Sequence, residues 1–252
     1  MRRPRLLVLL LLVAALLGGG VAAVRGLFLH DTVRAASVAN AIRGFRATGL
    51  TAKGVAGVYV YSTRGTESID ALGGARHSYP PTTSITAVAV PCGVRLDWRA
   101  LEGRSTSWTL CATPAGIEVK RYVEVHRFFG STDRTAYECA GTVLLPSARS
   151  ARASRPYRCR TSGATQVGTV LAVGRGNVGA DGTRRAAIHV RTTAHVLGAS
   201  HGTETVDWWL DARDALPLRI VLESRTSRKV IVLEVHYRED AVIDRVSATP
   251  RR

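Results

Sequence analysis

The sequence lacks the short motifs that mark the most common catalytic sites. It has no nucleophile elbow, no glycine-rich phosphate-binding loop and no zinc-protease helix. Its histidines are scattered, and no catalytic set can be assembled from them. We therefore assign no catalytic residue and no cofactor and expect a protein that is not an enzyme. An enzyme of unknown class is our third candidate, after a binding module and a structural or interaction subunit.

The sequence also lacks the C-x-x-C pairs and neighbouring histidines that a zinc site needs. We therefore predict no metal site. An even number of cysteines in an exported chain indicates disulfides instead. The sequence permits three pairings, and the hairpin-scale separations favour Cys92 with Cys111 and Cys139 with Cys159.

Charge is absent from the run Leu6–Val24, which follows three arginines at the N-terminus. The run is long enough to cross a bilayer as a helix, and its Leu-rich first part also suits a cleaved signal peptide. We expect residues 1–25 to be a signal-anchor or signal peptide. The rest is then extracytoplasmic, held at the cell membrane by residues 6–24, or secreted if residues 1–23 are cleaved.

Lysine is scarce, and arginine supplies most of the formal net charge of +16. Such a charge favours anionic partners at the cell surface, such as phosphate-bearing polymers or lipid headgroups. The predicted location disfavours nucleic acid. A GC-rich genome, which favours arginine and alanine codons, is an alternative explanation of the composition.

The segment 147–160, SARSARASRPYRCR, has almost no large apolar residue and is predicted to be a solvated loop. It is interpreted either as a polybasic patch for an anionic partner or as a soluble excursion held by Cys159. The candidate anion-binding residues are Arg149, Arg152, Arg155, Arg158 and Arg160.

Apolar residues with helical spacing predict one amphipathic helix within residues 26–49, with Asp31 as its N-cap and Val33, Val38, Ile42 and Phe45 on one face. It would pack on the body of the protein or lie at the membrane surface.

From Val55 onward, β-branched and aromatic residues between turn-forming clusters predict strands. Short turns favour antiparallel pairing. About 200 residues can bury one core, and no long linker divides them, so residues 50–250 are predicted to form a single domain. The predicted fold is mainly β, a curved, mostly antiparallel sheet or half-barrel with one N-terminal helix. The expected strands lie near 55–63, 83–90, 93–98, 106–111, 116–129, 134–140, 166–173, 184–196, 203–210, 216–224 and 229–237.

In the predicted strand 116–129, alternation places Tyr122, Glu124, His126 and Phe128 on one face. Tyr122 and Phe128 are candidate ligand-binding residues. Glu124 either orients His126 toward a ligand or pairs with an arginine on a neighbouring strand, and the cross-strand pair is the favoured interpretation.

Three more histidines lie close together in the sequence, at His189, His195 and His201. Three imidazoles can bind a metal or act in acid–base chemistry. No fourth ligand is identified, and we favour surface histidines on a sheet.

The adjacent residues Trp208 and Trp209 must point to opposite faces of a strand. One indole is therefore predicted to lie in a core, and the other to line a ligand cavity or a covered second face. Trp208 is the better core candidate because it shares its face with Val206 and Leu210. Both tryptophans are candidate ligand-binding residues.

The strings Trp209-Leu210-Asp211 and Leu216-Pro217-Leu218-Arg219 resemble the W-x-D…G-L-P-x-R hairpin of the bacterial lipoprotein-carrier group and its mycobacterial lipoprotein relatives. The resemblance covers residues 203–237. It implies a curved antiparallel half-barrel that holds acyl chains against a helical lid. The family's turn glycine is Ala215 here, and the lipid-attachment cysteine of the lipoprotein members is absent.

These observations predict an extracytoplasmic, membrane-anchored or secreted binding module. Its ligand would be a lipid or other apolar molecule, or an anionic envelope component. The alternative is a structural or interaction subunit of a membrane complex, and the oligomeric state stays open.

Overall fold

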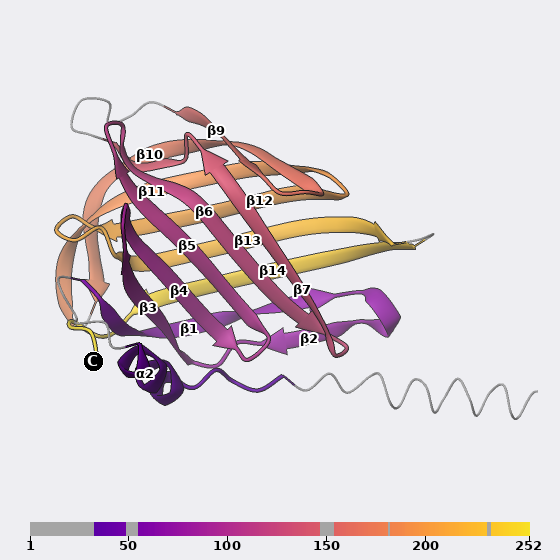
Figure 1. Ribbon diagram of the computed structural model, residues 1–252, viewed down its shortest axis with the longest axis horizontal. Helices are drawn as coiled ribbons and strands as arrows, with labels where there is room; N and C mark the ends of the chain where they lie inside the picture. Colours follow the sequence, from indigo (N-terminus) through magenta and orange to yellow (C-terminus); the bar gives the residue numbers. More distant parts are fainter. Residues whose placement is uncertain (1–32, 49–54, 147–153, 181, 231–232) are drawn as a thin grey trace, which may run out of the picture.

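The computed structural model describes residues 33–48, 55–146, 154–180, 182–230 and 233–252. This part of the chain is mostly one antiparallel sheet of fourteen strands, with the short helix α2 (Val38–Ala47) and the 3-10 turn η1 (Ala71–Gly73) (Figure 1). The predicted mainly β, antiparallel fold is confirmed. The strands are β1 (Gly57–Ile69), β2 (Ala75–Ser78), β3 (Thr82–Val90), β4 (Gly93–Leu101), β5 (Arg104–Thr113), β6 (Gly116–Phe128), β7 (Ser131–Ala140), β8 (Val143–Pro146), β9 (Arg155–Arg160), β10 (Ala164–Ala180), β11 (Thr183–Gly198), β12 (Ser200–Asp211), β13 (Pro217–Val230) and β14 (Leu233–Arg245).

The sheet closes on itself because its last strand pairs with its first. The pairing of β14 with β1 runs from Tyr61 opposite Arg245 to Ile69 opposite Tyr237. Twelve strands form the ring, and β2 and β8 lie beside it. In Figure 1, β3 to β7 form one wall and β10 to β14 the other, and the strands of the two walls cross.

The β14–β1 pairing, which we call one seam of the ring, has nine residue pairs and is longer than the β7–β9 seam. At the β14–β1 seam, Gly65 has a φ of 145°, and a Cβ there would lie 2.0 Å from the Asp240 carbonyl oxygen. Glycine is therefore required for the close approach of these strands. The β7–β9 seam has only the three residue pairs from Glu138–Arg160 to Ala140–Arg158, and the Cys139–Cys159 disulfide crosses it.

Both predicted disulfides are confirmed. Cys92, in the β3–β4 turn, is bonded to Cys111 of β5, and Cys139 of β7 is bonded to Cys159 of β9. The two bonds join cysteines that are 19 and 20 residues apart in the sequence and lie in neighbouring parts of the sheet, which is why the hairpin-scale spacing predicted the pairing.

Side chains that point into the ring form the main core. Trp108 of β5 and Trp208 of β12 meet edge to face, with ring centroids 5.1 Å apart, and so connect the two walls. The large apolar residues of this core include Tyr61, Ile85, Leu96, Trp98, Leu110, Leu210, Ile220 and Ile243.

Helix α2 packs on the ring through the face predicted for it. Phe45 is buried against Ala56 and Val58, with Ile42 beside it. The helix begins later than predicted, because the Ser37 hydroxyl caps it by accepting a hydrogen bond from the Asn40 backbone N–H, and Asp31 lies outside the described residues. No helix among the described residues is long and apolar enough to span a membrane.

Three short strands, β2, β8 and β9, were not predicted. The prediction of a loop over 147–160 is wrong for 155–160, where Tyr157 and Cys159 point inward and strand pairing on both sides holds β9. The expected strand 229–237 is also wrong in its bounds, since β13 continues to Val230 and β14 begins at Leu233. The predicted N-terminal segment 1–25 lies outside the described residues.

Candidate functional site

One end of the ring interior holds a group of hydrogen-bonded polar side chains, which we call the interior polar cluster. Its members are Glu67, His77, Tyr79, Arg104, His126, Tyr237 and Glu239. Strand alternation places them inside, because each shares its strand face with core residues.

Arg104 lies at the centre of this cluster and is fully buried. Its Nε donates to Glu239 Oε1 at 3.0 Å and its Nη2 to Glu239 Oε2 at 2.7 Å, a bidentate pair. Its Nη1 donates to Thr106 Oγ1 at 2.6 Å, and Glu124 Oε1 lies 3.9 Å from Nη2. The favoured cross-strand interpretation of Glu124, an arginine partner, agrees with this geometry.

Glu67 receives its partners from three strands. Its carboxylate lies 3.0 Å from His77 Nδ1 and 3.2 Å from His126 Nδ1, and the Tyr237 hydroxyl donates to it at 3.3 Å. Burial alone raises the pKa of Glu67, but the hydrogen bonds from both histidines and the charge of Arg104 outweigh it and hold the pKa at about 2. Glu67 is therefore a carboxylate at neutral pH, able to orient either imidazole.

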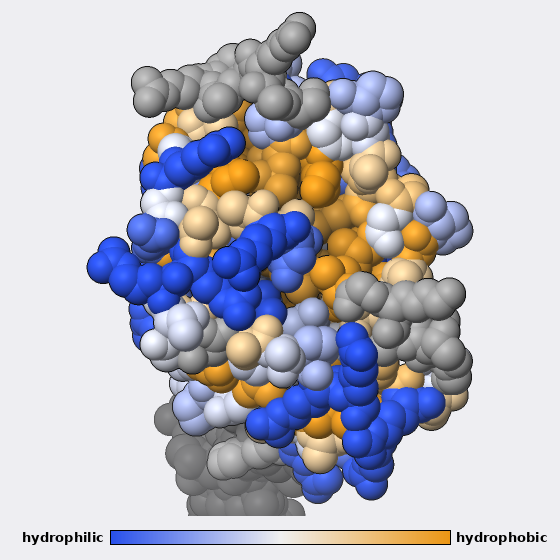
Figure 2. Space-filling model, turned by 90° about the vertical axis from the view of Figure 1, so that its left-hand side faces the viewer, coloured by the Kyte–Doolittle hydropathy of each residue, from blue (hydrophilic) through white to orange (hydrophobic). Residues whose placement is uncertain are grey.

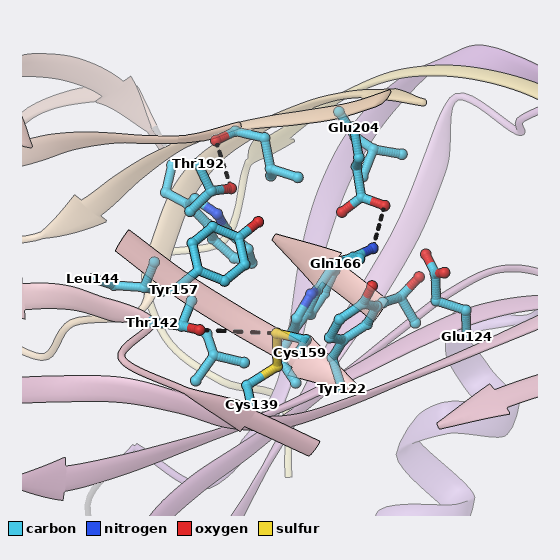
Figure 3. Close-up of a pocket in the computed structure, with 16 residues that line it drawn as sticks. Tyr122, Glu124, Cys139, Thr142, Leu144, Tyr157, Cys159, Gln166, Thr192 and Glu204 are labelled. Carbon is cyan, nitrogen blue, oxygen red and sulfur yellow. Dashed lines mark hydrogen bonds between the residues drawn. A yellow bond between two sulfur atoms is a disulfide. The ribbon is translucent and has the colours of Figure 1, made fainter. Parts of the chain in front are cut away.

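Beside the cluster lies an interior cavity of about 40 Å³ (Figure 3). Tyr122 and Tyr157 border it, and Gln166 Nε2 donates to Glu204 at 3.3 Å. Its remaining wall includes Trp108, Val119, the Cys139–Cys159 disulfide, Thr192, Val206, Trp208 and Leu222. A volume of this size holds a few water molecules and is far below the roughly 300–1,000 Å³ of small-molecule sites.

Two carboxyl groups at this cavity are held toward their protonated forms. Burial raises the pKa of Glu204 to about 8, and the negative charge of Glu124 adds to the shift. Burial also raises the pKa of Glu124, and the charges of His126 and Arg104 offset only part of this rise. A protonated carboxyl group can donate a hydrogen bond as well as accept one.

The wild-type protein is expected to lose stability as the pH rises to 8, and replacing Glu204 with glutamine should remove that loss. The folded-state pKa of about 8 lies above the ordinary value of 4.5, so folding retains a proton that the unfolded chain releases. The resulting stabilisation is complete below the ordinary value and is lost as the pH rises to 8. Denaturant curves recorded from about pH 5 to pH 8.5 should show a decrease about 4 kcal/mol smaller in Glu204→Gln than in the wild type.

Glu138→Gln is the matched control, because the Glu138 side chain is 70% exposed on the outer face. It should follow the wild-type pH dependence. Parallel curves for all three proteins would show that Glu204 has no raised pKa.

The predicted ligand-binding residues are not brought together at one place. Tyr122 and Trp208 line the interior cavity. Phe128 lies at the polar cluster, where its ring stacks on His77 with centroids 4.8 Å apart. Trp209 lies outside the ring.

The second tryptophan covers a small apolar cluster on the outer face. Trp209 packs against Val178, Ala180, Ala187 and Leu218, and so shields the end of the β10–β11 hairpin. Its ring stacks on His189 at 4.1 Å between centroids, and the Arg219 guanidinium lies 5.7 Å from its centroid. The prediction of one core indole and one on a covered second face is therefore confirmed, and Trp208 is the core residue.

The predicted anion-binding arginines lie partly in β9. Arg158 and Arg160 are exposed on its outer face, and Arg155 is half-buried. Arg149 and Arg152 lie outside the described residues.

The three neighbouring histidines do not converge. His189 pairs with Asp207 at 2.6 Å and His201 with Glu234 at 3.0 Å, while His195 is exposed. Within the described ranges, no group of three or more His, Cys, Asp or Glu side chains is arranged to hold a metal ion.

A second concave region, the outer groove, lies on the outer face where β1 runs between β2 and β14. Its volume is about 480 Å³, and its lining is Ser68, Ile69, Asp70, Gly74, Ala75, Arg76, His236 and Arg238. The outer groove could not be predicted from the sequence. Its residues come from segments about 170 positions apart, and only the closure of the ring brings these segments together.

Figure 2 shows an apolar hollow at the end of the ring where the β3–β4 and β5–β6 turns lie, bordered by hydrophilic side chains. Val94 of β4, Ile117 of β6 and Leu145 of β8, strands that reach this end, are only partly buried against the main core.

No protein-family model matches the chain, and neither does any curated protein. Among solved structures, the chain is similar to that of the hypothetical lipoprotein YmcC from Escherichia coli (K12), with 10% identity and a TM-score of 0.32 over 79% of this chain and 94% of that one. A TM-score this low assigns neither a family nor a function. The resemblance of residues 203–237 to the lipoprotein-carrier group therefore stays a prediction.

Proposed function

We propose that this protein is a non-enzymatic, extracytoplasmic module that binds an anionic, phosphate-bearing component of the cell envelope on the outer surface of its ring. The distribution of charge supports this most directly. Among the described residues, five acidic side chains are buried but only two basic ones, Arg104 and Arg245. Two of these acids, Glu67 and Glu239, lie inside the ring with Arg104, so the excess of basic residues in the chain falls largely on the outer surface, which attracts anions.

The size of the interior cavity supports an outer rather than an inner ligand. About 40 Å³ is too small for an acyl chain, because a binding site for even a small molecule needs several hundred Å³. The core of the ring is otherwise filled by aromatic and branched side chains.

The two disulfides fit an oxidising compartment, in agreement with an extracytoplasmic location. Attachment to the membrane through residues 6–24, or secretion after cleavage of residues 1–23, belongs to this proposal.

Binding to inorganic polyphosphate should be strong at low salt and fall steeply as salt is added, because exposed charges are screened over about 10 Å at 0.1 M ionic strength and about 3 Å at 1 M. Replacing Arg158 and Arg160 with glutamine should weaken it by about 1 kcal/mol for each lost charge. The full chain in non-ionic detergent can be titrated by calorimetry. Equal heats with polyphosphate and with a neutral polymer would contradict the proposal.

The second candidate function is a structural or interaction subunit of a membrane complex. The apolar hollow in Figure 2 favours it, because an exposed concave apolar surface fits coverage by a partner chain.

A further inference from the structure

We infer that the outer groove is a binding site for a phosphate monoester or diester, held between Arg76 and Arg238. The inference rests on the proposed function and assigns it to particular residues.

The register of the closed ring sets the positions of the two arginines. Ser68 of β1 lies opposite Arg76 of β2 on one side and opposite Arg238 of β14 on the other. Directly opposed residues have Cβ atoms about 4.5–5.5 Å apart on the same face. Each of the three residues has a buried neighbour in its strand, namely Glu67, His77 or Glu239. Because successive side chains point to opposite faces of a strand, Ser68 and the two arginines project outward together.

The other charges of the groove are already engaged. The Asp70 carboxylate accepts hydrogen bonds from the His236 backbone N–H and lies 2.7 Å from the His236 ring Nδ1. This contact also holds the end of β1 to β14. Asp70 is therefore directed to His236 rather than to either arginine.

Neither Arg76 nor Arg238 has an ion pair among the described residues, although Arg219 and Arg225 of the neighbouring strand β13 do. Arg76 Nη2 donates only to the Thr66 hydroxyl, at 3.3 Å. By contrast, Arg225 pairs with Asp240 at 3.1 Å, and Arg219 pairs with Asp244. Two exposed guanidinium groups are thus left to face the groove.

The register also places like charges side by side. Arg238 lies directly opposite Arg225 of β13 as well as next to Ser68. Arg225 is compensated by its pairs with Glu223 and Asp240, so Arg238 is the member of this opposed pair whose charge is left for an anion.

The chemistry of this row selects the ligand class. Guanidinium groups donate paired hydrogen bonds to the oxygens of a phosphate, and the Ser68 hydroxyl between them can donate another. A volume of about 480 Å³ exceeds that of one phosphate, so there is room for an esterified polyol or a lipid headgroup. An esterified polyol and a lipid headgroup both present a phosphate ester, which is the group that the site would recognise.

The test is an NMR titration of the ¹⁵N-labelled full chain in non-ionic detergent, in which the side-chain Nε–H signals of arginine are followed. Glycerol phosphate is the soluble probe, and mixed micelles with phosphatidylglycerol are the headgroup probe; glycerol and phosphatidylcholine are the uncharged and zwitterionic controls. We expect the signals of Arg76 and Arg238 to shift with one or both phosphate probes. A response to the soluble ester indicates a free phosphate ester as the ligand, and a response to the micelles alone indicates a headgroup.

The variant R76Q/R238Q should weaken this binding about tenfold or more, as expected for the loss of charged hydrogen bonds. The matched control is R99Q/R134Q, which removes two exposed arginines from β4 and β7 and should change the affinity less than about twofold. Equal weakening by both variants would overturn the groove as a site and leave general attraction to anions. No shift with either phosphate probe would overturn the inference, while salt-sensitive polyphosphate binding would still support the proposed function.

Discussion

Replacing Arg104 with methionine is expected to lower the free energy of unfolding by about 3–5 kcal/mol, since removal of one partner leaves buried charges uncompensated. Arg104 is fully buried and is the basic centre of the interior polar cluster. Without its guanidinium, the Glu239 carboxylate loses a bidentate partner and Glu67 loses the charge that lies 3.7 Å away. Urea denaturation followed by circular dichroism measures the change.

A second buried arginine, Arg245, provides the control. It donates to the backbone carbonyls of Ser247 and Ala248 and stacks on Tyr59, and no ion pair joins it to a described carboxylate. Arg245→Met should therefore cost only about 1–3 kcal/mol. Adding Glu239→Gln to Arg104→Met should restore part of the stability, because it removes one unpaired charge. Equal losses in the two single variants, with no recovery in the double variant, would contradict a stabilising ion network.

Trp208→Ala is expected to cost about 3–5 kcal/mol, the range for emptying a large aromatic site in a core. Trp208 is 2% exposed and its edge-to-face contact with Trp108 joins the two walls of the ring. The substitution also enlarges the neighbouring cavity. Because an apolar cavity can bind a small aromatic molecule, added indole should restore part of the lost stability.

Trp209→Ala is the natural comparison, since the two residues are adjacent and identical. Trp209 is only half-buried, on the outer cluster, so its replacement should cost about 1–2 kcal/mol and show no recovery with indole. If the order of the two losses were reversed, the placement of Trp208 at the wall contact would be wrong.

Alternation and spacing made several features predictable from the sequence. The opposite faces of Trp208 and Trp209 follow from strand geometry alone, and the same rule places Glu124, His126 and Phe128 together inside the ring. The disulfides were predictable because segments about 20 residues apart that lie side by side in a sheet are close in both sequence and space. For β9, the inward alternation of Tyr157 and Cys159 was present as a signal, but the high arginine content of the segment concealed it.

The interior polar cluster could not be predicted, because nothing local distinguishes a buried charge from an exposed one. Arg104 and Glu239 are 135 positions apart, and only the pairing of β14 with β1 makes them neighbours. The row of Arg76, Ser68 and Arg238 depends on the same pairing. The closure of the ring is therefore the feature that generates both the cluster and the outer groove.

An anionic ligand should contact the outside of the ring and not its interior. In an NMR titration of the full chain with inorganic polyphosphate, we expect salt-sensitive shifts of exposed arginine Nε–H signals and an unchanged Trp208 indole N–H signal, because the cavity of about 40 Å³ that Trp208 lines is too small for a phosphate polymer. Shifts of the Trp208 indole with unchanged outer arginines would contradict this expectation.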